Sequence, residues 1–448
     1  MWEYLGLFVA LGLIVLWCLG VYAFHKRGLL EPRGLHASPP PAGPFLMWKT
    51  VRGRRLIERL ARPKRLWKAF GDLSIVLVGI TMAGTTLLLL WEATLVRNAA
   101  IRANPPSPDL LLGLPGINPI IPLGYGIFGL AVAIILHEFS HGILSRAANI
   151  RIKSLGVIFL IFPIGAFVEP DEDELRALPR RERARLYAVG PATNIVLAIL
   201  FAVLFSSVMM ASVSPVHEGV GIVGFPSEGA SPAQAAGMQT YTVITRVNGT
   251  DVHSFADFTS ALSAVQANQT IEVVAFNPST GTSAAYAVTP AERNPVTGRA
   301  VLGVLAFDVE TSYYHPLTDA ERFGGVPGAI LTYISLPFQG RAPIQEPAVQ
   351  FYRVNGPLAV LPAPVFWILA NTVYWLFWLN IMLGATNALP AVPLDGGYIF
   401  RDGIEGLVSR LKKGLPAESR DRVVRGVSYT FALLILALVM WQLIGPRI

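Results

Sequence analysis

The chain has 448 residues, of which 53% are hydrophobic and 15% are charged, and its formal net charge is +7. Several apolar runs of roughly 20 residues indicate a polytopic membrane protein. The basic residues lie next to these runs, so the positive charge reflects membrane orientation and a nucleic-acid partner is not expected. The single cysteine, Cys18, excludes an internal disulfide and a cysteine-based metal site.

Six apolar segments are predicted to cross the membrane as helices. The first has no basic residue before it and is followed by Lys26 and Arg27, which favours an uncleaved anchor with its N-terminus outside. The six segments are residues 4–24, 74–92, 121–145, 186–213, 364–386 and 426–444.

The charge of the connecting loops predicts their side of the membrane. Loop 25–72 carries 12 Lys or Arg against 3 acidic residues and is therefore expected in the cytoplasm. Alternation then places 214–363 and the C-terminus outside, and 387–425 inside. The composition agrees, because 217–363 has 6 Arg and 11 acidic residues, whereas 398–425 has 7 Lys or Arg and 4 acidic residues.

Within the first basic loop, residues 52–70 (RGRRLIERLARPKRLWKAF) mix apolar and basic side chains at helical spacing. Such a segment is able to lie on an anionic inner leaflet of the membrane. A solvated basic linker is an equally good interpretation, and the sequence leaves both open.

The third predicted span contains the pentad HEFSH at residues 137–141. On a helix, His137 and His141 lie one turn apart on the same face, where two imidazoles can bind one zinc ion beside Glu138, a candidate general base. Ionisable groups inside a membrane-spanning helix are functional by default, although a pair of structural core histidines is the alternative. Catalytic zinc normally takes a third protein ligand, which must come from elsewhere in the chain.

The fourth predicted span opens near GPATN, residues 190–194. Gly190 and Pro191 are expected to loosen the start of its helix. Asn194 places an amide inside the lipid, where the amide needs a partner. This side chain can stabilise a contact between helices, which is the commoner role, or it can hold a substrate carbonyl.

The sequence pattern of the outer segment 217–310 predicts a small domain with β-strands. Short β-like runs are separated by turn signals such as Asn248-Gly249. A capping box formed by Ser254 and Asp257 is expected to open a short helix. Farther along the chain, residues 324–336 are read as an amphipathic or interfacial helix. The predicted strands are residues 219–225, 242–247, 270–276, 284–288 and 301–307.

The stretch NALPAVPLDGG at 387–397, after the fifth span, contains one acidic residue, Asp395. The glycine that follows it, Gly396, permits close backbone approach. By the predicted topology Asp395 and the pentad lie at similar depth, which a shared metal ion requires. Asp395 is therefore a candidate third ligand, and a turn residue at the membrane edge is an equally good interpretation. Asn387 in the same stretch has the same two possible roles as the asparagine of the fourth span.

Three motifs in this order resemble the site-2 proteases, a family of zinc-dependent intramembrane proteases. They are HEFSH at 137–141, GPATN at 190–194 and NALPAVPLDGG at 387–397, and each lies on or beside an apolar span. The resemblance implies that the substrates are single-span membrane proteins, whose transmembrane helices are cut within the bilayer.

The resemblance also implies a role for each candidate residue. One zinc ion per chain would be bound by His137, His141 and Asp395. Glu138 would act as the general base that activates the zinc-bound water. The implied substrate-binding residues, which would hold the peptide backbone or the developing oxyanion, are Asn194 and Asn387.

Two further segments resemble parts of the same family. The stretch GVIFLIFPIGAFVEP at 156–170 is similar to the segment that forms membrane-embedded β structure beside the active site, so a β segment is expected near 156–168. The runs SPAQAAGM at 231–238 and ITRVNGTDV at 244–252 resemble a PDZ domain, which site-2 proteases often carry between these spans. Peptide binding by strand addition and a simple spacer role both stay open for this module.

The expected fold is an α-helical polytopic membrane protein with about six transmembrane helices and an inserted α+β PDZ-like domain. The expected function is an intramembrane zinc endopeptidase of the cell membrane, with both termini and the PDZ-like domain outside and the active site toward the cytoplasm. A catalytically inactive adaptor that acts through the PDZ-like domain is the alternative. A metal transporter is disfavoured because the polar residues concentrate on two spans. The predicted divisions are 1–92 (two helices and the basic loop), 93–213 (first half of the protease core), 214–310 (PDZ-like domain), 311–363 (linker or interfacial segment) and 364–448 (second half of the core).

Overall fold

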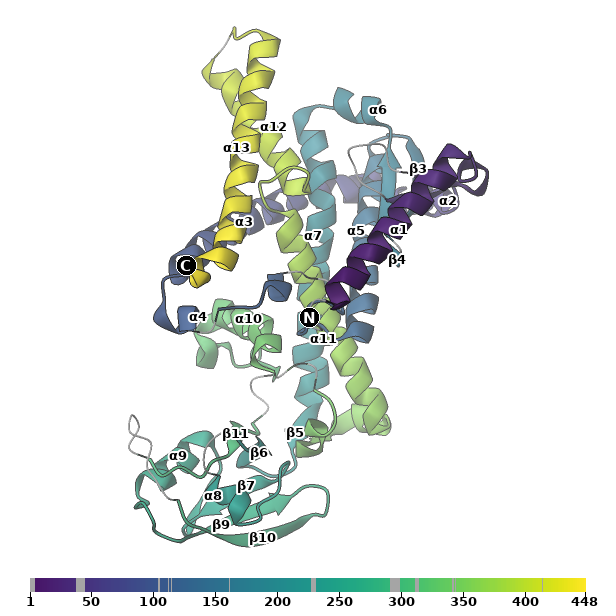
Figure 1. Ribbon diagram of the computed structural model, residues 1–448. Coiled ribbons are helices and arrows are strands. Elements are labelled where there is room, and N and C mark those ends of the chain that lie inside the picture. Colours follow the sequence, from purple (N-terminus) through teal and green to yellow (C-terminus); the bar gives the residue numbers. More distant parts are fainter. Residues whose placement is uncertain are drawn as a thin grey trace. The chain divides into compact units, whose positions relative to one another are not determined.

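The computed structural model divides into two compact units, which are described separately below (Figure 1). The first unit is formed by Met1–Ile199 with Trp375–Ile448, and the second by Leu200–Tyr374. The structure describes residues 5–37, 45–103, 105–111, 113, 115–160, 162–226, 231–290, 299–310, 314–340, 342, 344–412 and 414–448.

Within the described residues, five helices are long and apolar enough to cross a membrane. The chain is therefore a multi-pass membrane protein, as its composition predicted. Helix α1 (Leu5–Lys26) covers most of the first predicted span but is not among these five, so the total of six stays a prediction. The five are α3 (Lys64–Leu95), α5 (Leu123–Ala147), α7 (Arg180–Leu204), α11 (Ala363–Asn387) and α13 (Ala417–Ile444).

Helix α7 begins earlier than the sequence predicted. Pro191 lies inside the helix, so the expectation that Gly190 and Pro191 loosen its start is wrong. The basic turns before them belong to the helix as well, and their arginines form ion pairs such as that of Arg180 with Glu405. A proline is tolerated within a membrane-spanning helix when neighbouring elements satisfy the freed backbone groups.

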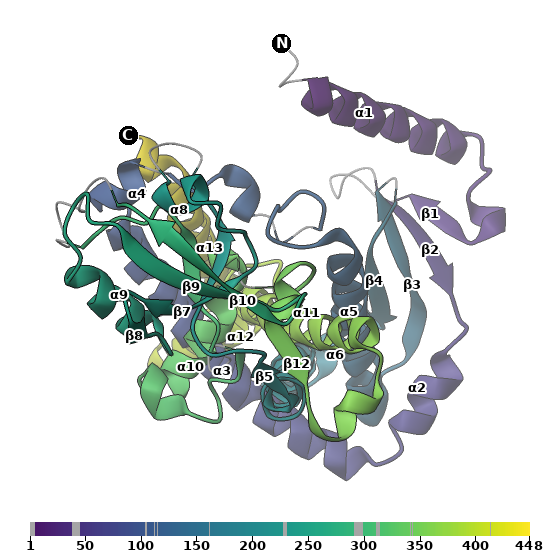
Figure 2. The same cartoon turned by 90° about the horizontal axis from the view of Figure 1, so that it is seen from below.

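A four-stranded antiparallel sheet lies beside α5 in the first unit. Its order is β1-β2-β3-β4, and Figure 2 shows the four strands in a row with α5 next to β4. The β segment expected near 156–168 lies within β3 and β4, whereas the two strands from the first basic loop were not predicted. The strands are β1 (Leu35–Ala37), β2 (Leu46–Thr50), β3 (Ile152–Leu160) and β4 (Phe162–Pro170).

Shorter helices complete the first unit. One apolar cluster packs α2 and α3 against α5, β3, β4 and α7, and it includes Ile57, Leu144, Val168 and Leu186. Helices α12 and α13 form a hairpin (Figure 1). The shorter helices are α2 (Arg54–Leu60), α4 (Ala99–Ala103), α6 (Glu172–Ala177) and α12 (Asp395–Leu411).

The second unit contains an antiparallel sheet of six strands with the path β10-β9-β7-β6-β11, and β8 pairs with β7. All five predicted strands overlap observed strands, although the one predicted at 301–307 begins only at Leu305. The predicted capping box opens α9 (Phe255–Ser263) through Ser254 and Asp257. The helix predicted at 324–336 is present as α10 (Gly325–Ser335). The remaining elements are β5 (Val213–Pro215), β6 (Val220–Gly224), α8 (Pro232–Ala235), β7 (Val243–Val247), β8 (Thr250–Asp251), β9 (Ile271–Asn277), β10 (Thr282–Val288), β11 (Leu305–Asp308) and β12 (Tyr352–Val354).

Candidate metal centre

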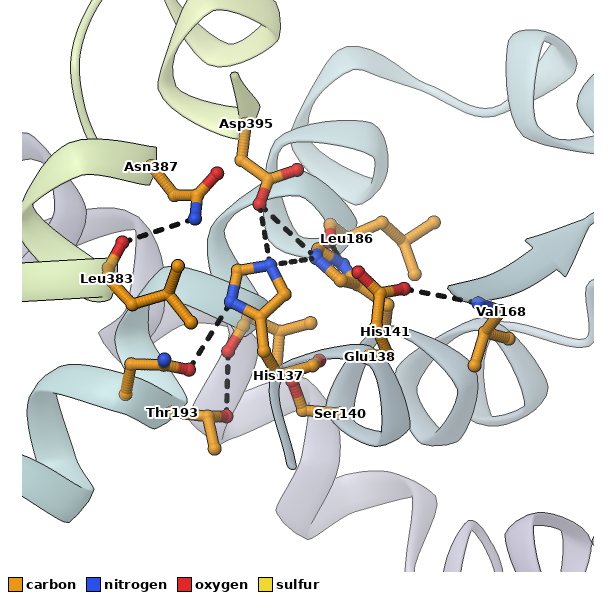
Figure 3. Close-up of polar contacts among 12 residues, drawn as sticks. His137, Glu138, Ser140, His141, Val168, Leu186, Thr193, Leu383, Asn387 and Asp395 are labelled. Atoms are coloured by element: carbon orange, nitrogen blue, oxygen red, sulfur yellow. Dashed lines mark hydrogen bonds and ion pairs between the residues drawn. The ribbon is translucent and has the colours of Figure 1, made fainter. Parts of the chain in front are cut away.

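Three possible ligand atoms from distant parts of the chain meet at one point. His137 Nε2 lies 3.0 Å from Asp395 Oδ2, and His141 Nε2 lies 3.3 Å from the same oxygen. The two imidazole nitrogens are 3.2 Å apart. Figure 3 shows both rings and the carboxylate turned toward this point. The structure thus brings together the three residues that the family resemblance implied as metal ligands.

The donor set and its spacing fit a zinc ion. Ligand atoms held at about 2.0–2.1 Å in tetrahedral geometry lie roughly 3.3 Å from one another. The three separations here are 3.0, 3.2 and 3.3 Å. Imidazole nitrogen and carboxylate oxygen are ligands that zinc takes in proteins, and three protein ligands leave the fourth position that catalytic sites require.

Each imidazole is oriented by a hydrogen bond from its other nitrogen. His137 Nδ1 donates to Asn194 Oδ1 at 3.3 Å, and His141 Nδ1 donates to the carbonyl oxygen of Leu186 at 2.7 Å. Both acceptors belong to α7. Because Nδ1 carries the proton in each ring, Nε2 keeps a lone pair for a metal, as is common around metal-binding histidines.

Asp395 reaches the two rings because α12 begins at this residue. A Cβ atom on Gly396 would lie 2.1 Å from the carbonyl oxygen of Ala388, so the close backbone approach predicted at this glycine is confirmed. Both rings turn their Nε2 atoms toward Oδ2 of Asp395, and an ionised carboxylate at this point is the form that binds a cation.

Gly190 was not singled out by sequence reasoning as a site residue. A Cβ atom at this position would lie 2.3 Å from His141 Nε2 and 2.6 Å from His137 Nε2. Any larger side chain would fill the space in front of the two metal-facing nitrogens. Gly190 belongs to the GPATN motif, which was recognised in the sequence. Its proximity to the two histidines could not be predicted, because they lie about 50 residues earlier in the chain.

Glu138 lies beside the three possible ligands and is anchored by the sheet. Its Oε2 accepts a hydrogen bond from the backbone N–H of Val168 at 3.1 Å (Figure 3). Val168 belongs to β4, the strand at the edge of the sheet nearest α5. The backbone of this edge strand therefore faces the site, and it holds the carboxylate next to the two candidate metal-binding histidines.

The two predicted substrate-binding asparagines lie in different surroundings. Asn194 is fully buried, and its Nδ2 donates to the carbonyl oxygen of Ala133 while its Oδ1 accepts from His137. Asn387 is half-buried at the end of α11, and its amide donates to the carbonyl oxygen of Leu383 at 3.1 Å (Figure 3). The contacts of Asn194 favour an orienting role, and substrate binding by either residue stays a prediction.

Sequence reasoning also missed the ion pair that holds α12 against α7. Arg183 donates from Nε and Nη2 to the two carboxylate oxygens of Asp402, each at 3.0 Å. The two side chains are only 17% and 14% exposed. Since the pair joins residues far apart in the chain, no local spacing could reveal it.

A cavity of about 1110 Å³ lies beside the site. Its walls include Val168, whose backbone N–H donates to Glu138, and Pro393, which lies two residues before Asp395. The remaining walls mix charged and apolar side chains. The lining residues are Met47, Lys49, Ile158, Phe167, Val168, Glu169, Pro170, Glu172, Leu175, Arg176, Arg183, Tyr187, Pro393, Tyr398, Arg401, Asp402 and Glu405.

Comparison with known proteins agrees with this geometry. The model of peptidase family M50 matches residues 125–435, which include all the candidate site residues. An uncharacterized protein of Methanocaldococcus jannaschii is 24% identical over 80% of this chain and 77% of its own length. The zinc metalloprotease RasP of Shouchella clausii is 24% identical over 62% of this chain and 63% of its own length. The metalloprotease MmpA of Caulobacter vibrioides is 24% identical over 63% of this chain and 86% of its own length.

Proposed function

The chain belongs to peptidase family M50 and is a metalloprotease of the site-2 type, and we propose that it hydrolyses peptide bonds within transmembrane helices of single-span membrane proteins. The observation that carries the proposal is the meeting of His137, His141 and Asp395 beside Glu138, next to an open strand edge. Metal, base and peptide-binding backbone would then be available in one place.

The two histidines and Asp395 would hold the zinc ion. A bound zinc ion supplies Lewis acidity toward a peptide carbonyl and toward water. The chain's own part in this is orientation. Asn194 and the carbonyl of Leu186 keep both rings in the required tautomer, and Gly190 leaves the space in front of them free.

Glu138 would move the proton. With Oε2 held by the N–H of Val168, the carboxylate is positioned to accept a proton from the attacking water. It would then pass that proton to the nitrogen of the departing amine. Such a positioned base contributes roughly 10²–10⁴-fold to the rate of a reaction of this kind.

The substrate would bind as an added strand on the open edge of β4. An intact helix hides its carbonyl groups in hydrogen bonds, so the substrate must unwind before it can be cut. The edge of β4 offers replacement hydrogen bonds close to Glu138. The adjoining cavity, which has charged side chains among its walls, would admit water to the site.

The topology completes the proposal. Both chain termini and segment 214–310 would lie outside the cell, and the metal centre would lie toward the cytoplasm. Segment 214–310 would be a PDZ-like domain that filters substrates or separates the spans. Its strands and its capped helix α9 support this interpretation.

Cleavage by the full chain in lipid vesicles tests the proposal. We expect the chain to cut single-span helices, a chelator to stop cleavage, and added zinc to restore it. Glu138→Gln should retain zinc and lose cleavage by roughly 10²–10⁴-fold, whereas Asp395→Ala should lose zinc. Glu418→Gln, which changes an exposed carboxylate in the first turn of α13, is the matched control and should behave as the unaltered chain.

Two results would contradict the assignments. Full zinc content in Asp395→Ala would remove this carboxylate from the metal shell. Unimpaired cleavage by Glu138→Gln would exclude it as the base. A zinc-loaded chain that cuts no helix in a broad panel would instead support the adaptor function.

A further inference from the structure

Several arginine side chains in the segment around α2 have no partner among the residues that the structure describes. Arg52, Arg55, Arg59, Arg62 and Arg65 are all exposed, and we call them the arginine face. The guanidinium groups of these five arginines form no ion pair or hydrogen bond with another residue in the described part of the chain. Five uncompensated positive charges therefore stand within 14 residues of one another.

Helical geometry separates this face from the buried side of α2. At about 100° per residue, Ile57 lies roughly 160–200° around the helix from Arg55 and Arg59. Ile57 is fully buried. Leu56 and Leu60 lie between the two sides and are 48% and 42% exposed. The helix thus has a charged side, an exposed apolar side and a packed side, which is the pattern of a helix lying in a membrane interface.

The position of α2 along the chain agrees with this pattern. Helix α3 follows after a short turn and has 32 residues, a length of about 48 Å, whereas the hydrocarbon core is about 30 Å thick. Its first turns, which contain Arg65 and Lys68, are therefore able to extend into the headgroup region. Leu66 in the same turns is 64% exposed, so apolar and basic side chains alternate at this level.

We propose that the arginine face binds the phosphate groups of anionic phospholipids, with Leu56, Leu60 and Leu66 inserted at the acyl boundary. Guanidinium groups recognise phosphate through paired hydrogen bonds. The exposed leucines favour a lipid over a nucleic acid or a free phosphate, because only the lipid offers an apolar layer beside its charge.

The bound lipid would stabilise α5, the helix that carries His137 and His141. The Cδ1 atom of Ile57 lies 3.0 Å from where a Cβ atom on Gly142 would be, and Gly142 follows the candidate ligand His141. Glu58 on the other side of α2 lies 3.6 Å from Arg146 of α5. Lipid that holds α2 in place therefore stabilises the native packing around α5.

Titration of the purified full chain with dioctanoyl phosphatidylglycerol in a nonionic detergent tests this proposal. The lipid should raise the temperature of thermal unfolding, whereas dioctanoyl phosphatidylcholine should have no comparable effect. Replacing Arg55, Arg59 and Arg62 by Gln should weaken the apparent affinity for the anionic lipid by roughly 100-fold. Raising the salt from about 0.05 M to about 0.5 M should weaken it as well.

Two control variants and one soluble probe separate the alternatives. Replacing the same three arginines by Lys keeps the charge but removes the paired hydrogen bonds, so this variant should bind more weakly than the unaltered chain and more tightly than the Gln variant. Arg176→Gln, which changes an exposed arginine already paired with Glu172, should leave the affinity unchanged. Equal stabilisation by phosphatidylcholine, or unchanged affinity in the Gln variant, would overturn the proposal. Equal stabilisation by glycerol phosphate would also overturn it, because the leucines would then have no part.

Discussion

Two arginine-rich segments of the first unit differ in what their charges meet. The arginine face around α2 has no partner in the described part of the chain, whereas the arginines of 176–185 are all in ion pairs with acidic residues. The same residue type therefore serves two purposes. Paired arginines hold elements of the fold together, and unpaired arginines beside exposed leucines are available to a ligand.

The paired segment acts on the metal centre through α12. Arg183 binds Asp402, which lies about two helical turns after Asp395 on the same face of α12. Arg180 adds a second contact to this helix through Glu405 at 3.0 Å. Arg180 and Arg183 thereby hold α12, the helix that begins with Asp395. We expect these two arginines to act as positioning residues for the site.

The largest effect is expected from breaking the paired segment. Arg183→Ala leaves the carboxylate of Asp402 largely buried without its partner, which should lower the free energy of unfolding by about 3–5 kcal/mol. Zinc content should fall too, because α12 loses its anchor. Unfolding in mixed detergent micelles and metal analysis measure the two effects.

The double variant Arg183→Ala with Asp402→Ala is the control for this prediction. Removing both charges should recover part of the lost stability, since no buried charge is then left unpaired. A single variant as stable as the unaltered chain would show that the pair does not hold α12.

A smaller loss of stability is expected on the packed side of α2. Ile57→Ala removes a fully buried side chain that contacts α5, and it should cost about 2–5 kcal/mol. Leu56→Ala, one residue away and half-exposed, is the matched control and should cost far less. Equal losses in the two variants would contradict the assignment of a packed and an exposed side.

The smallest effect is expected on the arginine face itself. Without anionic lipid, Arg59→Gln should change the free energy of unfolding by less than about 0.5 kcal/mol, because the side chain has no partner among the described residues. The same unfolding measurement in lipid-free detergent checks this. A loss comparable to that of Arg183→Ala would mean that the two segments do not differ in the way proposed.

Much of the molecule was predictable from local patterns. The apolar runs predicted the long helices, and alternating runs with turn signals predicted the five strands of the second unit. The spacing of His137 and His141 predicted that their rings share one side of a helix, and α5 places them so. The order of three motifs identified the family, which the comparison with known proteins confirmed.

Other features were not predictable because they depend on contacts between distant residues. Strands β1 and β2 lie in the first basic loop, where only charge and an amphipathic stretch were recognised in the sequence. Strand β1 pairs with β2, and β2 pairs with β3, which lies about 100 residues farther along the chain. The start of α7 was misplaced because the ion pairs that hold its first turns involve partners on other helices.

The sequence by itself determined the membrane class, the helix that carries the imidazole pair and the family, because helix periodicity and motif spacing act over a few residues. Only the tertiary structure decided whether Asp395 reaches the two rings, that Gly190 leaves space in front of them, and which arginines are paired. Those facts depend on how separate elements pack. The partners His137 and Asp395, or Arg183 and Asp402, are more than 200 residues apart, and no periodic pattern in the sequence relates residues at that distance.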